Sequence, residues 1–350
     1  MKRKLCLLVE LDAPTRDALA ERFAIAAFGK GGDDRDRIVD EAELLALLSR
    51  ERPEVAIIEQ EPVTSRVVAA AAPELRLVAC VRAAPNNIDL AACRDKGILV
   101  TNAPGRNAVA VVEMTIGFMI CLARFIPQTH HEIMCRRLTL SPGAPLNRDD
   151  ILWQHPDLKR NPYILYRGVE IDGRTLGLVG LGIIGRMLAP KAAALGLRLM
   201  VCDPYVDAAA AAAVGAEKVG LDYLLANADF VSLHAKVTPE TRGMIGRREF
   251  ELMKPDAYFI NTARGALVKQ DDLVRILRER RIAGAALDVY DQEPQYHDSP
   301  FLELDNVILT PHIGGATKDG IKHQSRLVLR NVLAYLDGTR PPNLVNPPPA

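Results

Sequence analysis

The chain has 350 residues, of which 49% are hydrophobic and 25% charged, and this length is enough for two domains that each bury a core. Lys plus Arg and Asp plus Glu both number 44, so the formal net charge is zero and indicates neither a nucleic-acid partner nor an anionic membrane. Six well-separated cysteines without a C-x-x-C pair favour reduced thiols over a zinc site or a disulfide framework, and no metal is expected.

Short apolar runs alternate with helical stretches along the whole chain. In chain order, the runs expected to form buried strands are Leu5–Val9, Val55–Glu59, Leu75–Val81, Ile98–Thr101, Leu176–Gly180, Leu197–Cys202, Phe230–His234, Ala257–Asn261, Ala283–Val289 and Val307–Thr310. Helices are expected between many of them, for example over Asp12–Phe23, Arg186–Leu195 and Leu273–Arg280. Continuous apolar strands that alternate with helices are typical of parallel sheets covered on both faces. The sequence therefore predicts an α/β fold with two doubly wound parallel-sheet domains, divided near residue 105.

Three segments stand apart from this alternation. Glu10 interrupts the apolar N-terminal run before a signal-peptide core forms, so we expect a cytoplasmic protein. Ala108–Arg124 is apolar on nearly every face of a helix but is short and contains Glu113, so we expect it to be buried between domains or subunits. Leu138–Tyr166 is broken by several prolines and predicts a long irregular excursion before the second sheet begins.

The sharpest local motif is the glycine-rich turn Gly180-Leu181-Gly182-Ile183-Ile184-Gly185. It follows an apolar strand and opens a helix, which is the context that a dinucleotide-binding turn requires. The three glycines suit a tight turn, a close approach of the backbone to pyrophosphate, and close packing of helix on strand. The free N–H groups at the start of the helix would bind the phosphates.

Asp203 ends the next strand, about 20 residues after the turn, where a carboxylate can accept hydrogen bonds from a ribose diol. A 2′-phosphate would be repelled there, and the following Pro204-Tyr205 supplies no arginine, so NAD is favoured over NADP. The alternative is a plain glycine turn with Asp203 as an ordinary loop residue.

Three further segments follow predicted strands and carry side chains suited to reducing a carbonyl group. They are Asn261–Gly265, Asp288–Pro294 and Thr310–Gly315. The carboxyl ends of parallel strands converge on the crevice where ligands bind. Hydride transfer to a 2-oxo acid needs a proton donor, a cation for the carboxylate and a group that tunes the donor, and histidine, arginine and glutamate are the types expected.

With these motifs in order, the chain resembles the D-isomer-specific 2-hydroxyacid dehydrogenase family, and most of all its phosphoglycerate dehydrogenase branch. The similar stretches are KGILVTNAPG, DGRTLGLVGLGIIG, MKPDAYFINTARG, AGAALDVYDQEP and NVILTPHIGGAT. The resemblance implies a Rossmann NAD-binding domain over residues 108–314, inserted into a flavodoxin-like substrate domain made of residues 1–107 and 315–350. It also implies a homodimer formed through the cofactor domain, with Ala108–Arg124 at the interface.

The resemblance assigns roles to individual residues. His312 would exchange a proton with the substrate oxygen, Glu293 would orient the imidazole and favour its charged form, and Arg264 would bind the substrate carboxylate. Asp288 would face the nicotinamide carboxamide. Further cofactor contacts are expected from Thr262, Ala263, Gly314 and, by packing on the adenosine side, His234.

The loop Arg82–Asp89 departs from the family pattern, because it is shorter and Pro85 offers no N–H donor. The family holds the substrate carboxylate with backbone amides of this loop, so Ala84 and Asn86 are expected to form a rebuilt substrate site. Arg82 is retained and would read an anionic or hydroxylated tail. The leading expected substrate is 3-phosphoglycerate.

Other readings share parts of this pattern. A sugar-acid dehydrogenase or a hydroxypyruvate or glyoxylate reductase would use the same residues. A formate dehydrogenase has the same fold but places glutamine where this chain has Glu293. A corepressor that senses NAD(H) keeps the same catalytic residues, and turnover of a 2-oxo acid would distinguish the enzyme from it.

Overall fold

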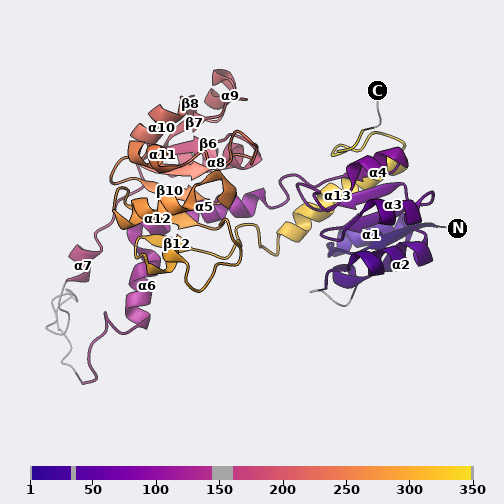
Figure 1. The fold of residues 1–350 in the computed structure, drawn as a ribbon, viewed down its shortest axis with the longest axis horizontal. Helices are drawn as coiled ribbons and strands as arrows, with labels where there is room; N and C mark the ends of the chain where they lie inside the picture. The colour runs from indigo at the N-terminus through magenta and orange to yellow at the C-terminus, as the bar shows by residue number, and fades with distance from the viewer. Residues whose placement is uncertain (1, 33–36, 144–160, 348–350) are drawn as a thin grey trace. The chain divides into compact units, whose positions relative to one another are not determined.

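The computed structural model describes residues 2–32, 37–143 and 161–347, which form two compact units (Figure 1). Unit 1 consists of Met1–Asn107 and Ala316–Ala350, and unit 2 of Ala108–Gly315. Each unit is built on a parallel sheet, with strand order β2-β1-β3-β4-β5 in unit 1 and β12-β11-β10-β9-β6-β7-β8 in unit 2. The predicted α/β class with two parallel-sheet domains is confirmed.

Unit 1 contains a five-stranded sheet with helices on both faces. Its strands are β1 (Arg3–Leu7), β2 (Phe23–Ala27), β3 (Val55–Ile58), β4 (Leu77–Cys80) and β5 (Leu99–Thr101). Its helices are α1 (Ala13–Arg22), η1 (Gly29–Gly31), α2 (Glu41–Glu51), α3 (Ser65–Ala71), α4 (Leu90–Asp95) and α13 (Gly320–Leu336). Alternate strand residues point to opposite faces. Leu5 and Ile57 therefore share a core with Leu19 of α1 and Val328 of α13, whereas Cys6 packs with residues of α2 and α3.

Unit 2 contains the seven-stranded sheet. Its strands are β6 (Thr175–Val179), β7 (Arg198–Cys202), β8 (Ala216–Lys218), β9 (Phe230–Leu233), β10 (Tyr258–Asn261), β11 (Gly284–Leu287) and β12 (Val307–Leu309). Its helices are α5 (Ala108–Arg124), α6 (Ile126–Met134), α7 (Pro162–Leu165), α8 (Ile183–Ala194), α9 (Ala208–Ala212), α10 (Leu221–Asn227), α11 (Arg247–Leu252), η2 (Gly265–Leu267), α12 (Gln270–Arg278) and η3 (Pro300–Glu303).

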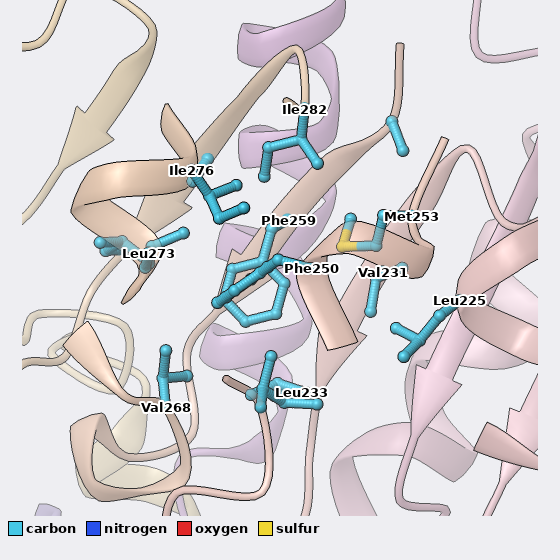
Figure 2. Close-up of a cluster of buried hydrophobic side chains, with 14 of the residues drawn as sticks. Leu225, Val231, Leu233, Phe250, Met253, Phe259, Val268, Leu273, Ile276 and Ile282 are labelled. Atoms are coloured by element: carbon cyan, nitrogen blue, oxygen red, sulfur yellow. The ribbon is translucent and has the colours of Figure 1, made fainter. Parts of the chain in front are cut away.

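Two hydrophobic clusters cover the faces of the unit 2 sheet. On one face, Phe250 of α11 meets Phe259 of β10 edge to face, with ring centroids 5.1 Å apart, and Leu273 and Ile276 of α12 complete the packing (Figure 2). On the other face, residues of α5 and α8 pack against β6 and β10. This double cover fixes the strand ends that carry the candidate site.

Helix α5 has the predicted bounds. Nine of its residues are buried, and five of these nine, Phe118 and Met119 among them, belong to the hydrophobic cluster with the sheet and α8 of its own unit. Among the described residues, no single helix meets the length and hydropathy expected of a membrane span, and only α5 and α6 taken together do so, across a 66° bend.

The sequence missed two strands, β2 and β8. Strand β2 begins at Phe23, directly after α1 ends at Arg22, so no turn residue separates them. Strand β8 has only three residues, two of them charged. The excursion predicted over Leu138–Tyr166 falls largely on residues 144–160, which lie outside the described residues.

Candidate active site

Three adjacent strands of unit 2 bring the predicted catalytic residues to one edge of the sheet. Strands β10, β11 and β12 are neighbours and run parallel. Arg264 follows β10, Glu293 follows β11 and His312 follows β12, so all three lie beyond carboxyl ends. This is the edge at which open α/β sheets bind ligands.

Glu293 and His312 are in direct contact. The Nδ1 atom of His312 lies 2.6 Å from Oε2 of Glu293, and the other carboxylate oxygen accepts the backbone N–H of Tyr290 at 2.9 Å. The side chains are 45% and 34% exposed, so the pair remains open to a ligand. Because Nδ1 is bound to Glu293, Nε2 is the ring atom left to exchange a proton.

The backbone of His312 is held in an uncommon conformation. Its φ is +57°, a left-handed value that costs a non-glycine residue free energy. Buried Asp288 stabilises this turn by accepting hydrogen bonds from Thr310 Oγ1 (2.6 Å), Ile313 N (2.8 Å) and Gly314 N (2.7 Å). Both Asp288 oxygens thus hold the loop that presents His312, a role that the sequence did not indicate.

The Arg264 loop is organised by Asn261. The Asn261 side chain donates to the carbonyl of Arg264 at 2.9 Å and accepts the N–H of Ala263 at 3.0 Å. Thr262 is buried, with its hydroxyl 3.3 Å from that of Thr115 in α5. Arg264 itself is exposed and forms no ion pair with any residue that the structure describes, so its guanidinium is available to a carboxylate.

Tyr290 joins the three catalytic segments. Its hydroxyl donates to the carbonyl oxygens of Leu287 and Thr310, each at 3.0 Å, while its backbone N–H holds Glu293. A Cβ atom on Gly265 would lie 2.2 Å from the Tyr290 carbonyl oxygen, so only glycine permits this approach after Arg264. Burial raises the pKa of the Tyr290 hydroxyl to about 12, so it stays a neutral donor.

The glycine-rich turn lies between β6 and α8, as the sequence predicted. Gly180 has a φ of +102°, and a Cβ there would lie 2.8 Å from the backbone of His234. A Cβ on Gly185 would lie 2.6 Å from the carbonyl oxygen of Gly180, so this glycine allows the helix to pack close to the turn. Gly182, at the N-cap of α8, has open space beside it, and no side chain caps the helix.

The surroundings of the turn fit a dinucleotide. Uncapped N–H groups at the start of α8 suit phosphate, and half-exposed Ile183, followed by partly buried Ile184, offers an apolar surface there. Asp203 accepts the N–H of Leu181 at 2.7 Å and that of Tyr205 at 2.9 Å. Its carboxylate therefore braces the turn in addition to lying where a ribose is expected.

His234 follows β9 beside Gly180. Its Nε2 lies 2.9 Å from the Ser232 hydroxyl, and its Nδ1 is buried without a hydrogen-bond partner among the described residues. Burial lowers the pKa of His234 to about 4, so the ring is neutral at pH 7. A neutral, packed imidazole is compatible with the predicted place on the cofactor side.

The predicted substrate residues Arg82, Ala84 and Asn86 lie in unit 1, beyond the carboxyl end of β4. The carbonyl of Arg82 accepts the N–H of Ala103 at 2.9 Å, and the N–H of Asn86 donates to the carbonyl of Ala84 at 3.0 Å. Ala84 and Asn86 are exposed. These contacts define a tight turn at the same edge of the sheet as the end of β3.

Two residues that organise the site, Asn261 and Tyr290, were not predicted from the sequence. Asn261 is the last residue of β10 and Tyr290 follows β11 within a few residues, and a polar residue at the carboxyl end of a parallel strand is the signal that could have identified them.

Comparisons with known proteins identify the family of this chain. The family model for the NAD-binding domain of D-isomer-specific 2-hydroxyacid dehydrogenases matches residues 145–314. The chain is 37% identical over 275 residues to the glyoxylate reductase of Thermococcus litoralis, a match that covers 79% of this chain and 78% of that protein.

A second relative is longer. The chain is 36% identical over 296 residues to the D-3-phosphoglycerate dehydrogenase of Methanocaldococcus jannaschii, covering 84% of this chain but only 52% of that protein. The fold matches the NAD-complexed structure of a D-isomer-specific 2-hydroxyacid dehydrogenase from Lactobacillus delbrueckii ssp. bulgaricus, with a TM-score of 0.78. The match covers 99% of this chain and all of the Lactobacillus chain, at 23% sequence identity.

Proposed function

Because this chain belongs to the D-isomer-specific 2-hydroxyacid dehydrogenase family, we propose that it interconverts a small D-2-hydroxy acid and its 2-oxo acid with NAD. The observation that carries this proposal is the contact of Glu293 with His312 at the carboxyl edge of the NAD-binding unit, one strand away from Arg264, which forms no ion pair with a described residue.

NAD, when bound, supplies the nicotinamide that gives or takes the hydride. The chain's own residues hold it: the α8 N–H groups beside Gly182 bind its phosphates, and the Asp203 carboxylate binds a ribose diol. His234, Thr262, Ala263, Asp288 and Gly314 line the same edge of the sheet and are assigned to the cofactor.

In the reducing direction, Nε2 of His312 gives a proton to the substrate oxygen, and in the oxidising direction it takes that proton back. Glu293 accepts the hydrogen bond from Nδ1, which fixes the orientation of the ring and leaves Nε2 toward the substrate. Arg264 binds the carboxylate next to the reacting carbon, which orients the substrate.

We assign substrate recognition to Arg82, Ala84 and Asn86 of unit 1. The relatives are named for 3-phosphoglycerate and glyoxylate, and Arg82 favours a substrate with a polar tail, either phosphorylated or hydroxylated. A sugar-derived acid or hydroxypyruvate would use the same residues. NADH oxidation with a panel of 2-oxo acids tests the assignment, and absence of turnover with every member would refute it.

We further propose that the chain acts as a homodimer in the cytoplasm. All six cysteines are free, which suits a reducing compartment. Helix α6 has no buried residue, and Ile133 (53% exposed) and Met134 (68%) lie on it, while Ile164 of α7 is 62% exposed. Exposed apolar side chains of this kind are typical of a protein interface. We therefore place the dimer contact on α6 and α7, next to the predicted segment Ala108–Arg124.

A further inference from the structure

A cluster of charged side chains lies at the carboxyl edge of the unit 1 sheet, where the proposed substrate loop also begins. Lys30 follows β2, Glu59 follows β3, Arg82 follows β4, and Arg106 lies in the segment after β5. These strands are parallel, so the first three residues share one edge. No role in the proposed reaction has been assigned to Lys30, Glu59 or Arg106.

The cluster is centred on the Glu59 carboxylate, which is bound to two cations. Its Oε2 lies 2.9 Å from Lys30 Nζ, and its Oε1 lies 2.7 Å from the Arg106 guanidinium. Arg106 also donates to the side chain of Gln324. The three charged side chains are 15–26% exposed, so they are partly withdrawn from water yet still reachable. The two cations lower the pKa of Glu59 and keep it ionised.

The cluster and the substrate loop form one rigid piece. Buried Glu61 accepts the N–H groups of Glu59 (2.7 Å) and Gln60 (3.1 Å), which fixes the turn that presents Glu59. The Asn87 side chain, in the substrate loop, donates to the carbonyl oxygens of Glu59 (3.3 Å) and Glu61 (2.7 Å). The charged cluster therefore lies beside the loop to which we assign the substrate.

The chemistry of the cluster selects one kind of tail. Lys30 has spare N–H donors and Glu59 has spare acceptor sites, and a hydroxyl group can use both because it donates and accepts. A methyl or methylene group would leave these remaining donor and acceptor sites without hydrogen bonds while excluding water from them, which is costly. Because Glu59 pairs with both cations and neutralises one of them, the cluster attracts a phosphate dianion less than two free cations would, and it places a carboxylate beside the phosphate.

We infer that Lys30, Glu59 and Arg106 form a specificity site that recognises the hydroxyl groups of an unphosphorylated, sugar-derived 2-oxo acid. The inference rests on the proposed dehydrogenase function and narrows its substrate, because it ranks a hydroxylated tail above the phosphorylated one.

The test compares kcat/KM for three 2-oxo acids with NADH. They are 3,4-dihydroxy-2-oxobutanoate, 2-oxobutanoate, which lacks only the two hydroxyls, and phosphohydroxypyruvate. The wild type is expected to prefer the dihydroxy acid over 2-oxobutanoate by about 100-fold or more, as hydrogen-bonding sites reject analogues that lack the hydroxyl. It is also expected to prefer the dihydroxy acid over phosphohydroxypyruvate. A best rate with 2-oxobutanoate or phosphohydroxypyruvate would overturn the inference and leave the dehydrogenase function intact. No turnover of any 2-oxo acid would refute both.

Glu59→Gln provides the second arm, because it keeps the shape of the side chain and removes its charge. We expect the preference for the dihydroxy acid over 2-oxobutanoate to fall at least about tenfold, and kcat/KM for phosphohydroxypyruvate to rise, since two cations are left without their anion. Lys30→Gln should also lower the preference for the dihydroxy acid over 2-oxobutanoate. It replaces Glu59→Gln in the test if that variant does not fold.

The matched control is Glu54→Gln. Glu54 is also an ion-paired carboxylate of unit 1, bound to Arg3 at 3.0 Å and to the Tyr335 hydroxyl at 2.7 Å, but it precedes β3 and so lies at the opposite edge of the sheet. Its substitution should leave the substrate preference unchanged. If Glu59→Gln lowers the melting temperature as Glu54→Gln does and changes no preference, the cluster is only structural and the inference is wrong.

Discussion

His312 is the residue on which the proposed chemistry depends most directly. Its Nδ1 is bound to Glu293, and its loop is tied down by three hydrogen bonds to Asp288. Replacement by alanine removes the proton donor but none of the contacts of the glycine-rich turn. We expect kcat of His312→Ala to fall by about 10²–10⁴, the usual contribution of general acid–base catalysis, with little change in NADH affinity measured by fluorescence titration. A folded variant with near-normal kcat would contradict the assignment.

His234 predicts a pH dependence of stability. Its pKa is about 4 in the folded chain against 6.5 for a free side chain, so the unfolded state binds the proton first as the pH falls. Stability from this residue is fully present above pH 6.5 and is lost between 6.5 and about 4. By pH 5 the loss should be about 2 kcal/mol.

The measurement is urea unfolding of the wild type and His234→Gln at pH 7 and pH 5. Glutamine does not titrate, so the wild type should lose about 2 kcal/mol more than the variant between the two pH values. If the free energy of unfolding falls by the same amount in both proteins, the His234 imidazole can be protonated in the folded state.

At the scale of elements, two substitutions in the glycine-rich turn separate its effect on stability from its effect on NADH binding. Gly180→Ala puts a Cβ 2.8 Å from the His234 backbone at a φ of +102°, and should destabilise the chain by about 2 kcal/mol or more. Gly182→Ala meets nothing within 4 Å and has an ordinary φ of −73°, so its stability should be near that of the wild type.

The added methyl group of Gly182→Ala would occupy the space in front of the α8 N–H groups, so its NADH affinity should still fall about tenfold or more. Thermal melts paired with NADH titrations measure both properties. If Gly182→Ala binds NADH with normal affinity, the phosphates of NADH do not bind at the start of α8.

Most of the fold could be predicted because apolar runs such as Val55–Ile58 and Phe230–Leu233 are buried on both faces of their sheets and are bounded by polar residues. Strand β2 could not, since Phe23–Ala27 continues directly from a helix and contains three alanines. The residues that we propose as catalytic were chosen from ordered motifs, and the structure places them beyond three adjacent strands. The partners of Glu59 could not be predicted, because Lys30 and Arg106 lie 29 and 47 residues away and meet it only through the strand order.

At the scale of the whole molecule, the proposed dimer can be tested by substitutions on α6. Ile133 and Met134 are exposed on this helix, and replacing both with glutamate puts two charges into the contact. We expect the wild type to elute as a dimer and the double variant as a monomer in size-exclusion chromatography with light scattering. Tyr223→Glu is the control, because Tyr223 is 55% exposed on the distant element α10. A wild type that is monomeric at assay concentrations would exclude the dimer.

The division of unit 1 into two chain segments sets an order on its folding during synthesis. Unit 2 is continuous from Ala108 to Gly315, so the ribosome delivers all of it before α13 exists. The core of unit 1 is completed only after α13 is made, because Val328 and Val332 of α13 pack against Leu5, Leu7 and Ile57. Of these two units, the one whose synthesis starts earlier is therefore completed later, and the part of its sheet face that α13 covers stays exposed while some 200 further residues are made. A nascent chain arrested before α13 should show a protease-resistant unit 2 and a protease-sensitive unit 1.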